Sequence, residues 1–178
     1  MSNTRYTAEQ AAALIARQRA RQDKNQARLL AKAKDCLKPA LTPHAKYAAV
    51  IGIDPGTHTG IAIREGKEWK SIQTLTIIEA IEIVKRVSAA HAGNILVRIE
   101  DARKRTYFGD SGPEKAQGAG SIKRDCSIWE DEMTRSKIRF EFVHPRNVKA
   151  TDATTFKRLT GWQGRTSIHA REAAWLIL

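Results

Sequence analysis

The chain has 178 residues, two widely separated cysteines, and no apolar run near the ~20 residues that cross a bilayer. Lysine and arginine number 31 against 19 aspartate and glutamate, a formal net charge of +12. These features argue against a membrane span, a secreted disulfide framework and a zinc site, and they predict a cytoplasmic protein with reduced thiols. A nucleic acid is the first expected partner of so basic a chain, and an anionic membrane the second.

Residues 1–45 are predicted to form a basic helical extension that ends in a linker. Thr7-Ala-Glu-Gln10 has the pattern of a capping box, and Pro39 cannot continue a helix. The helix is either an arm that contacts the DNA backbone or a solvated, partner-binding segment, and both interpretations stay open. Its basic members are Arg17, Arg19, Arg21, Lys24, Arg28, Lys32, Lys34 and Lys38.

Residues 46–178 are predicted to form one compact α/β domain. An apolar run over 48–54 resembles a buried central strand, and the turn at Asp54-Pro-Gly-Thr57 returns the chain into a second strand over 60–64. A third strand is expected over 69–75. The apolar residues of 77–90 recur at helical spacing, so a helix should follow.

The second half of this domain continues with alternating elements. A strand is predicted over 95–100, a helix over 114–135, a strand over 138–143, and then a loop region with Gly161 and Gly164 before a final helix from about Ser167. Three hairpin-linked strands followed by parallel crossovers match a ribonuclease-H-like fold: a mixed five-stranded sheet flanked by helices, here with an N-terminal basic helix.

Acidic residues occupy special places in this order of elements. Asp54 ends the first strand and Glu100 ends the fourth, so parallel neighbours would bring both to one C-terminal edge. His169 and Glu172 are three residues apart on the final helix and therefore face the same way. Grouped carboxylates favour a bound Mg²⁺ or Mn²⁺, and such a cluster supports two-metal phosphodiester hydrolysis.

Each of these residues also has a structural interpretation. Asp54 fits the side-chain cap of an Asp-Pro-Gly turn, and Glu100 fits a salt-bridged strand end near Arg103. Glu172 in a first helical turn would complement the helix dipole, and His169 would be a satisfied residue at a helix start. Their joint occurrence in the matching topological positions favours a metal site.

Four segments resemble a known family. Ile51-Gly-Ile-Asp-Pro-Gly-Thr-His-Thr-Gly60 resembles the first motif of RuvC-type Holliday junction resolvases, which belong to the ribonuclease-H-like superfamily, and Val97-Arg-Ile-Glu100 resembles their second motif. Ala116-Gln-Gly-Ala-Gly-Ser121 is similar to the start of their central helix, and His169-Ala-Arg-Glu-Ala-Ala174 to their last motif. The resemblance covers about 47–178 and suggests a phage or mobile-element variant.

The resemblance implies a site and an activity. Asp54, Glu100, His169 and Glu172 would be catalytic metal ligands for two Mg²⁺ ions per active site, with Mn²⁺ expected to substitute. A homodimer, joined through the central helix, would place paired symmetric nicks in a four-way DNA junction and leave 5′-phosphate and 3′-hydroxyl ends. Glu172 stands where the family has Asp, and His169 where it has Asp or sometimes His, which affects metal spacing and metal choice.

The resemblance also implies residues that contact DNA. Lys157 would be the catalytic lysine near the scissile phosphate, with Lys149 as a rival, and Arg165 would bind the backbone. Tyr107 and Phe108 would stack on an unpaired base, or else pack in the core. Both lysines also fit an ordinary solvated surface.

Three other functions compete with junction resolution. A catalytically weak protein with the same fold would bind junctions in EDTA and cut with no metal. A ribonuclease-H-like nuclease for other branched or hybrid nucleic acids would prefer flaps or RNA–DNA hybrids. An actin-like ATPase shares an Asp-x-Gly-Thr phosphate loop, but that fold normally needs two such domains.

Overall fold

The computed structural model describes residues 8–37, 46–104, 113–145 and 152–178, and the chain divides into two compact units, Met1–Pro39 and Ala40–Leu178. In the first unit, α1 (Ala8–Leu37) is one helix of 30 residues, which confirms the predicted basic helix. Residues 38–45, which include the predicted linker from Pro39 to His44, lie outside the described residues. None of the described helices is long and apolar enough to cross a membrane.

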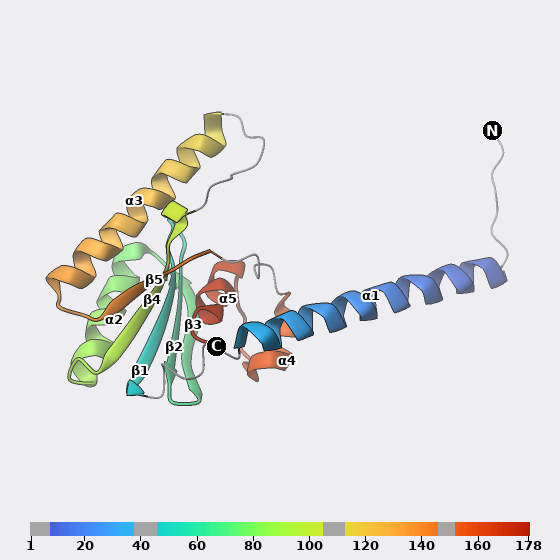
Figure 1. The fold of residues 1–178 in the computed structure, drawn as a ribbon, viewed down its shortest axis with the longest axis horizontal. Coiled ribbons are helices and arrows are strands. Elements are labelled where there is room, and N and C mark those ends of the chain that lie inside the picture. Colours follow the sequence, from blue (N-terminus) through green and yellow to red (C-terminus); the bar gives the residue numbers. More distant parts are fainter. Residues whose placement is uncertain (1–7, 38–45, 105–112, 146–151) are drawn as a thin grey trace. The chain divides into compact units, whose positions relative to one another are not determined.

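The second unit is built on a five-stranded sheet of order β3-β2-β1-β4-β5 (Figure 1). Strands β1 (Ala49–Asp54), β2 (Thr59–Glu65) and β3 (Glu68–Leu75) form an antiparallel meander. Strand β4 (Ile95–Glu100) is parallel to β1, and β5 (Phe140–Val143) is parallel to β4. This order and these directions confirm the predicted ribonuclease-H-like fold.

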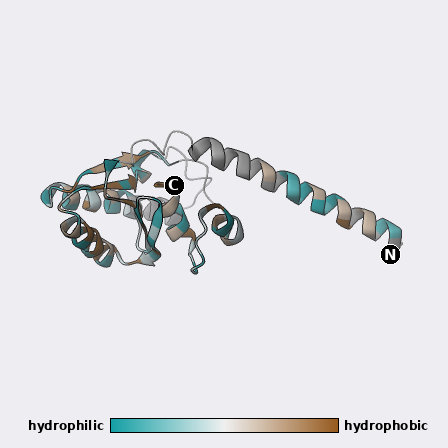
Figure 2. Ribbon diagram, turned by 90° about the horizontal axis from the view of Figure 1, so that it is seen from below, coloured by the Kyte–Doolittle hydropathy of each residue, from teal (hydrophilic) through white to brown (hydrophobic). Residues whose placement is uncertain are grey.

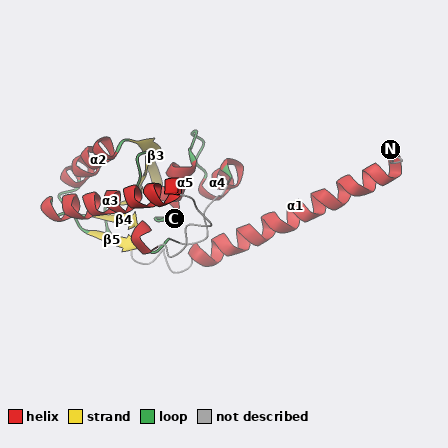
Figure 3. Cartoon of the chain, turned by 90° about the horizontal axis from the view of Figure 1, so that it is seen from above, coloured by secondary structure: helices red, strands yellow, loops and turns green. Residues whose placement is uncertain are grey.

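Helices cover both faces of the sheet because the central strands are apolar on both sides (Figures 1 and 3). Ile51 and Ile53 of β1 belong to a core with α2 (Ile77–Ala90) and α3 (Pro113–Arg135). The alternate residue Val50 belongs to a second core with α5 (Ile168–Trp175). Side chains alternate along a strand, so Asp54 faces the α5 side, as Val50 does.

Helix α4 (Ala153–Thr160) replaces part of what the sequence pattern predicted as a loop, and that prediction was wrong. Three threonines in its eight residues lower its helix propensity, which hides it from periodicity. Both ends are capped: Asp152 Oδ1 accepts from the Thr155 N–H at 2.9 Å, and Gly161 adopts a left-handed φ of 73°. Phe156 is fully buried in the second core, which fixes the helix against the domain.

Candidate metal centre

Asp54 and Glu100 lie side by side at the C-terminal edge of the sheet. Asp54 is the last residue of β1 and Glu100 the last of β4, and the preceding residues Ile53 and Ile99 are paired in parallel register. Both residues are buried, with exposed fractions of 6% for Asp54 and 4% for Glu100. By the alternation of the strands, both carboxylates start from the face that α5 covers.

Helix α5 brings two further ligand-type side chains to Asp54. His169 Nδ1 lies 2.9 Å from Asp54 Oδ2 and 3.9 Å from Glu172 Oε2. One ligand atom from each of the three residues lies within 4.8 Å of the other two. Two carboxylates and an imidazole, contributed by a strand end and one helix turn, therefore form a compact donor set.

The carboxylate of Glu100 is outside this donor set in the described part of the chain. Its backbone is nevertheless held at the same edge by the pairing of β4 with β5, in which Glu100 is opposite Val143, and the Cys126 thiol of α3 also donates to the Glu100 carbonyl at 3.6 Å. The predicted position of Glu100 beside Asp54 is thus present at the level of the strands. The convergence of its carboxylate with the other three stays a prediction.

Two glycines let α5 approach the sheet closely enough to reach Asp54. A Cβ atom at Gly52 would overlap the carbonyl oxygen of Ala173, and one at Gly60 would overlap the carbonyl oxygen of His169. Gly60 is also the residue that pairs with Asp54 in the β1–β2 register. Because Gly60 has no side chain, the backbone of His169 can lie directly over the strand pair that carries Asp54.

Both ends of α5 are fixed by polar contacts. At the start, Ser167 caps the helix by accepting from the Ala170 N–H, and its hydroxyl lies 2.5 Å from that of Thr74 on β3. At the end, Arg98 of β4 donates to the Leu176 carbonyl at 2.5 Å, and Arg64 of β2 donates to the Ile177 carbonyl at 3.2 Å.

The two arginines come from the strands on either side of β1 and meet the negative end of the helix dipole. Burial lowers the pKa of Arg64 from its ordinary value. Sequence reasoning missed this role, although a charged residue within a buried apolar strand is itself a signal, because it must find a partner. Together the contacts at both ends determine where His169 and Glu172 lie along the sheet.

A second charged cluster begins immediately after Glu100. Asp101 is buried, and Arg103 of the short helix η2 (Ala102–Lys104) donates to it at 2.7 Å and to Glu130 of α3 at 2.5 Å. The Arg103 guanidinium also lies 4.3 Å from the ring centroid of Phe142. Burial alone would raise the pKa of Asp101, but the hydrogen bonds and charge of Arg103 outweigh it and lower that pKa. The sequence offered a salt-bridged strand end as the alternative role of Glu100; in the structure, the neighbouring Asp101 forms that salt bridge with Arg103.

The donor chemistry of the cluster fits a divalent cation. Carboxylate oxygens suit Mg²⁺ and Mn²⁺, and an imidazole nitrogen shifts the preference toward Mn²⁺. Asp54 and Glu172 are largely buried, with side-chain exposures of 9% and 15%, whereas His169 is half exposed. The cluster is therefore fixed on its inner side and accessible from solvent at His169.

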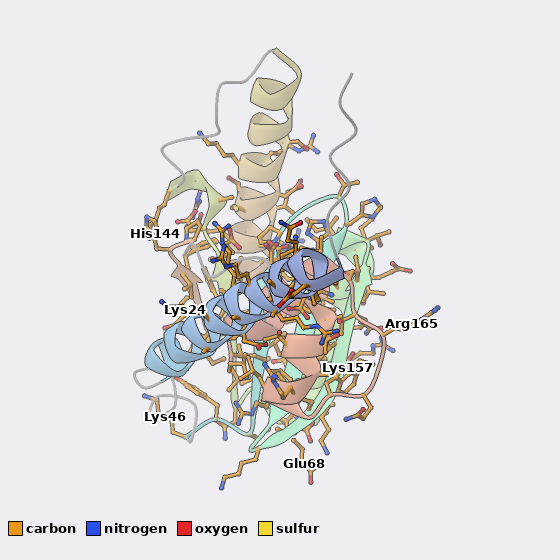
Figure 4. All side chains as sticks on the ribbon, turned by 90° about the vertical axis from the view of Figure 1, so that its right-hand side faces the viewer. Lys24, Lys46, Glu68, His144, Lys157 and Arg165 are labelled. Carbon is orange, nitrogen blue, oxygen red and sulfur yellow. The ribbon has the colours of Figure 1, made fainter. Side chains whose placement is uncertain are left out.

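The remaining predicted site residues are placed only in part. Lys157 is half-buried on α4 and Arg165 is exposed in the segment between α4 and α5 (Figure 4). Lys149, Tyr107 and Phe108 lie outside the described residues. Their contacts with DNA stay predictions.

Comparison with solved structures finds a likeness to one described as T. thermophilus RuvC in complex with Holliday junction substrate. The two chains are 16% identical, the match covers 72% of this chain and 90% of that chain, and the TM-score is 0.45. No family model matches this chain, and a search of curated proteins found no match. The order and direction of the five strands define the fold.

Proposed function

We propose that this chain is a divalent-metal-dependent endonuclease that cuts branched DNA, with the four-way junction as its substrate. The observation that carries the proposal is the convergence of Asp54, His169 and Glu172 within 4.8 Å, at the sheet edge where β4 ends in Glu100. In open α/β sheets the C-terminal edge is where functional sites form. The family motifs in which these four residues occur point to junction cleavage.

The metal ligands in this proposal are Asp54, Glu172 and His169, with Glu100 joining them from the neighbouring strand. Mg²⁺ or Mn²⁺, two ions per site, would supply a nucleophilic water at neutral pH and stabilise the leaving oxygen. Buried Asp54 is held at a strand end and so presents its carboxylate in one direction. Half-exposed His169 borders the solvent side, where the phosphodiester would enter.

The rest of the chain would bind and orient the substrate. A net charge of +12 attracts a polyanion and speeds its encounter with the site. Lys157 and Arg165 are the proposed contacts to the backbone near the scissile phosphate. A homodimer would place two such sites on a two-fold junction, since a two-fold assembly matches a two-fold substrate.

A substrate panel tests this proposal. Labelled four-way junction, flap, linear duplex and RNA–DNA hybrid of matched sequence are incubated with the protein in Mg²⁺, Mn²⁺ and EDTA. We expect paired symmetric nicks in the junction with either metal, none in EDTA, and little cutting of the linear duplex. Preferential cutting of the flap or the hybrid would assign the site to another branched or hybrid substrate.

A second candidate, a junction-binding protein with weak catalysis, is favoured by two observations. The Glu100 carboxylate lies outside the three-residue donor set, and His169 brings an imidazole where an acid would add negative charge. This candidate predicts tight junction binding in EDTA and no cleavage with any divalent metal. His169→Asp separates the two further, because a third carboxylate should shift the metal preference of a true nuclease from Mn²⁺ toward Mg²⁺.

A further inference from the structure

Basic residues of α1 gather along one side of the helix. Arg17, Arg21 and Lys24 are exposed and follow one another at steps of four and three residues, the spacing that keeps side chains on one face. In the sequence the same spacing continues with Arg28 and Lys32. No acidic residue occurs at this spacing between 17 and 32, and Asp35 is the first to follow on it, so basic residues outnumber acidic ones on this face by five to one.

The other side of the same helix is close to neutral. Arg19 is followed four residues later by Asp23, a spacing at which opposite charges offset each other on a helix. Ala12, Ile15 and Ala16 are exposed near them, and in the coloured, N-terminal part of α1 Figure 2 shows hydrophilic residues interspersed with apolar ones. The positive charge of α1 is therefore directional, which solubility alone does not require.

We propose that the face of α1 defined by Arg17, Arg21, Lys24, Arg28 and Lys32, the basic stripe, is a binding surface for the phosphate backbone of DNA. At 1.5 Å per residue, the 15 steps from residue 17 to residue 32 cover roughly 22 Å. One DNA strand presents a phosphate about every 3.4 Å of helix axis, so the basic stripe is long enough to follow roughly six phosphates. Its recognition is by charge and carries no base specificity.

DNA fits this surface better than a membrane does. Helices that lie in a membrane interface bury Trp, Phe and Leu on the face opposite their charges, and α1 contains no aromatic residue. Its large aliphatic residues, Leu14, Ile15, Leu29, Leu30 and Leu37, leave positions 16–28 without one, so the sequence of α1 has no continuous apolar face. The choice of DNA as the partner rests on the proposed function. The basic stripe is a further DNA-contact surface, and it lies on a separate unit from the metal centre.

The test compares two double variants with the same change in charge and residue type. Arg21→Gln/Lys24→Gln removes one arginine and one lysine from the basic stripe. Arg19→Gln/Lys34→Gln, the control, removes one arginine and one lysine that lie outside the basic stripe. Binding of the full-length variants to an uncleaved linear duplex and to a four-way junction is measured in EDTA over a salt series. Far-UV circular dichroism checks that both variants keep the helix, as glutamine should allow.

The expected result is a salt dependence of log K that is shallower by about 0.9 for each lost phosphate contact, hence by about 1.8 for the stripe variant and near zero for the control. Charge-preserving Arg21→Lys/Lys24→Arg should restore the slope. Equal effects of the two doubles, or no effect of either, would overturn the inference. So would loss of binding to anionic phosphatidylserine vesicles with DNA binding unchanged. The binding assay needs no cleavage. If the protein cuts no DNA but the stripe and control variants still differ in salt dependence, the proposed function is refuted and the DNA-binding role of the basic stripe stands.

Discussion

Substitution of Gly60 by alanine tests how the structure holds the metal centre together. The added methyl group would overlap the carbonyl oxygen of His169 and approach the Ala170 nitrogen to 3.1 Å. The neighbour is helix backbone, so the first turn of α5 must retreat by roughly 1 Å, a displacement that can lower a catalytic rate about 100-fold. The 2.9 Å contact between His169 and Asp54 would then open.

The expected consequences of Gly60→Ala are separable from unfolding. Overpacking of this kind costs about 1–3 kcal/mol of stability, which a thermal melt will register. In the metal-free protein, the ¹⁵N signals of the His169 ring should shift, and calorimetry should show weaker Mn²⁺ binding. Gly120→Ala on α3 is the matched control, because a Cβ there meets nothing within 4 Å. If both variants keep wild-type His169 signals and Mn²⁺ affinity, the close approach of α5 does not set the site.

Three further predictions concern the supports of the fold. Arg98→Met removes a charged hydrogen bond to the Leu176 carbonyl at the end of α5, and it should cost about 1.5–3 kcal/mol in denaturant unfolding and weaken Mn²⁺ binding. Arg139→Met removes an exposed side chain that donates to the half-buried Tyr47, and it should change neither. Asp152→Ala should cost about 1 kcal/mol. Hydrogen bonds from the α4 backbone lower the pKa of the Asp152 carboxyl. The ionised carboxylate therefore stabilises the fold above the unfolded pKa of about 3.9, and this stabilisation is lost as the pH falls through the lower folded pKa. Asp152→Asn should lack this pH dependence. Burial raises the pKa of the Cys126 thiol, which makes it a poor nucleophile in the folded domain. In a Cys36→Ser background, iodoacetamide should therefore label Cys126 only as the domain unfolds, and rapid labelling of the native protein would contradict this.

The fold was predictable where local patterns and topology agree. The apolar run that ends at Asp54, the Asp-Pro-Gly turn and the returning strand required only alternation and turn chemistry, and β1 and β2 pair accordingly. Helix α4 was missed because its threonines mask it, although Asp152 and Gly161 are usable cap signals.

The site was predictable in its members and only partly in its geometry. Spacing of three residues on a helix places His169 and Glu172 together, and the structure brings both to Asp54. The roles of Arg64 and Arg98 depend on which carbonyls α5 leaves at its end, a tertiary relation between residues more than 70 positions apart. No sequence pattern specifies the side-chain conformation of Glu100, so the convergence of its carboxylate with the cluster stays a prediction.

Cleavage of a labelled four-way junction in Mn²⁺ by Asp54→Asn, beside wild type and the matched variant Asp125→Asn, tests the central claim most directly. Asp125 is likewise a buried aspartate, but it lies on α3 outside the donor set, so it controls for loss of a buried charge. We predict paired nicks by wild type and Asp125→Asn and none by Asp54→Asn, which should still bind the junction in EDTA. Equal cutting by Asp54→Asn would contradict the assignment of the metal centre.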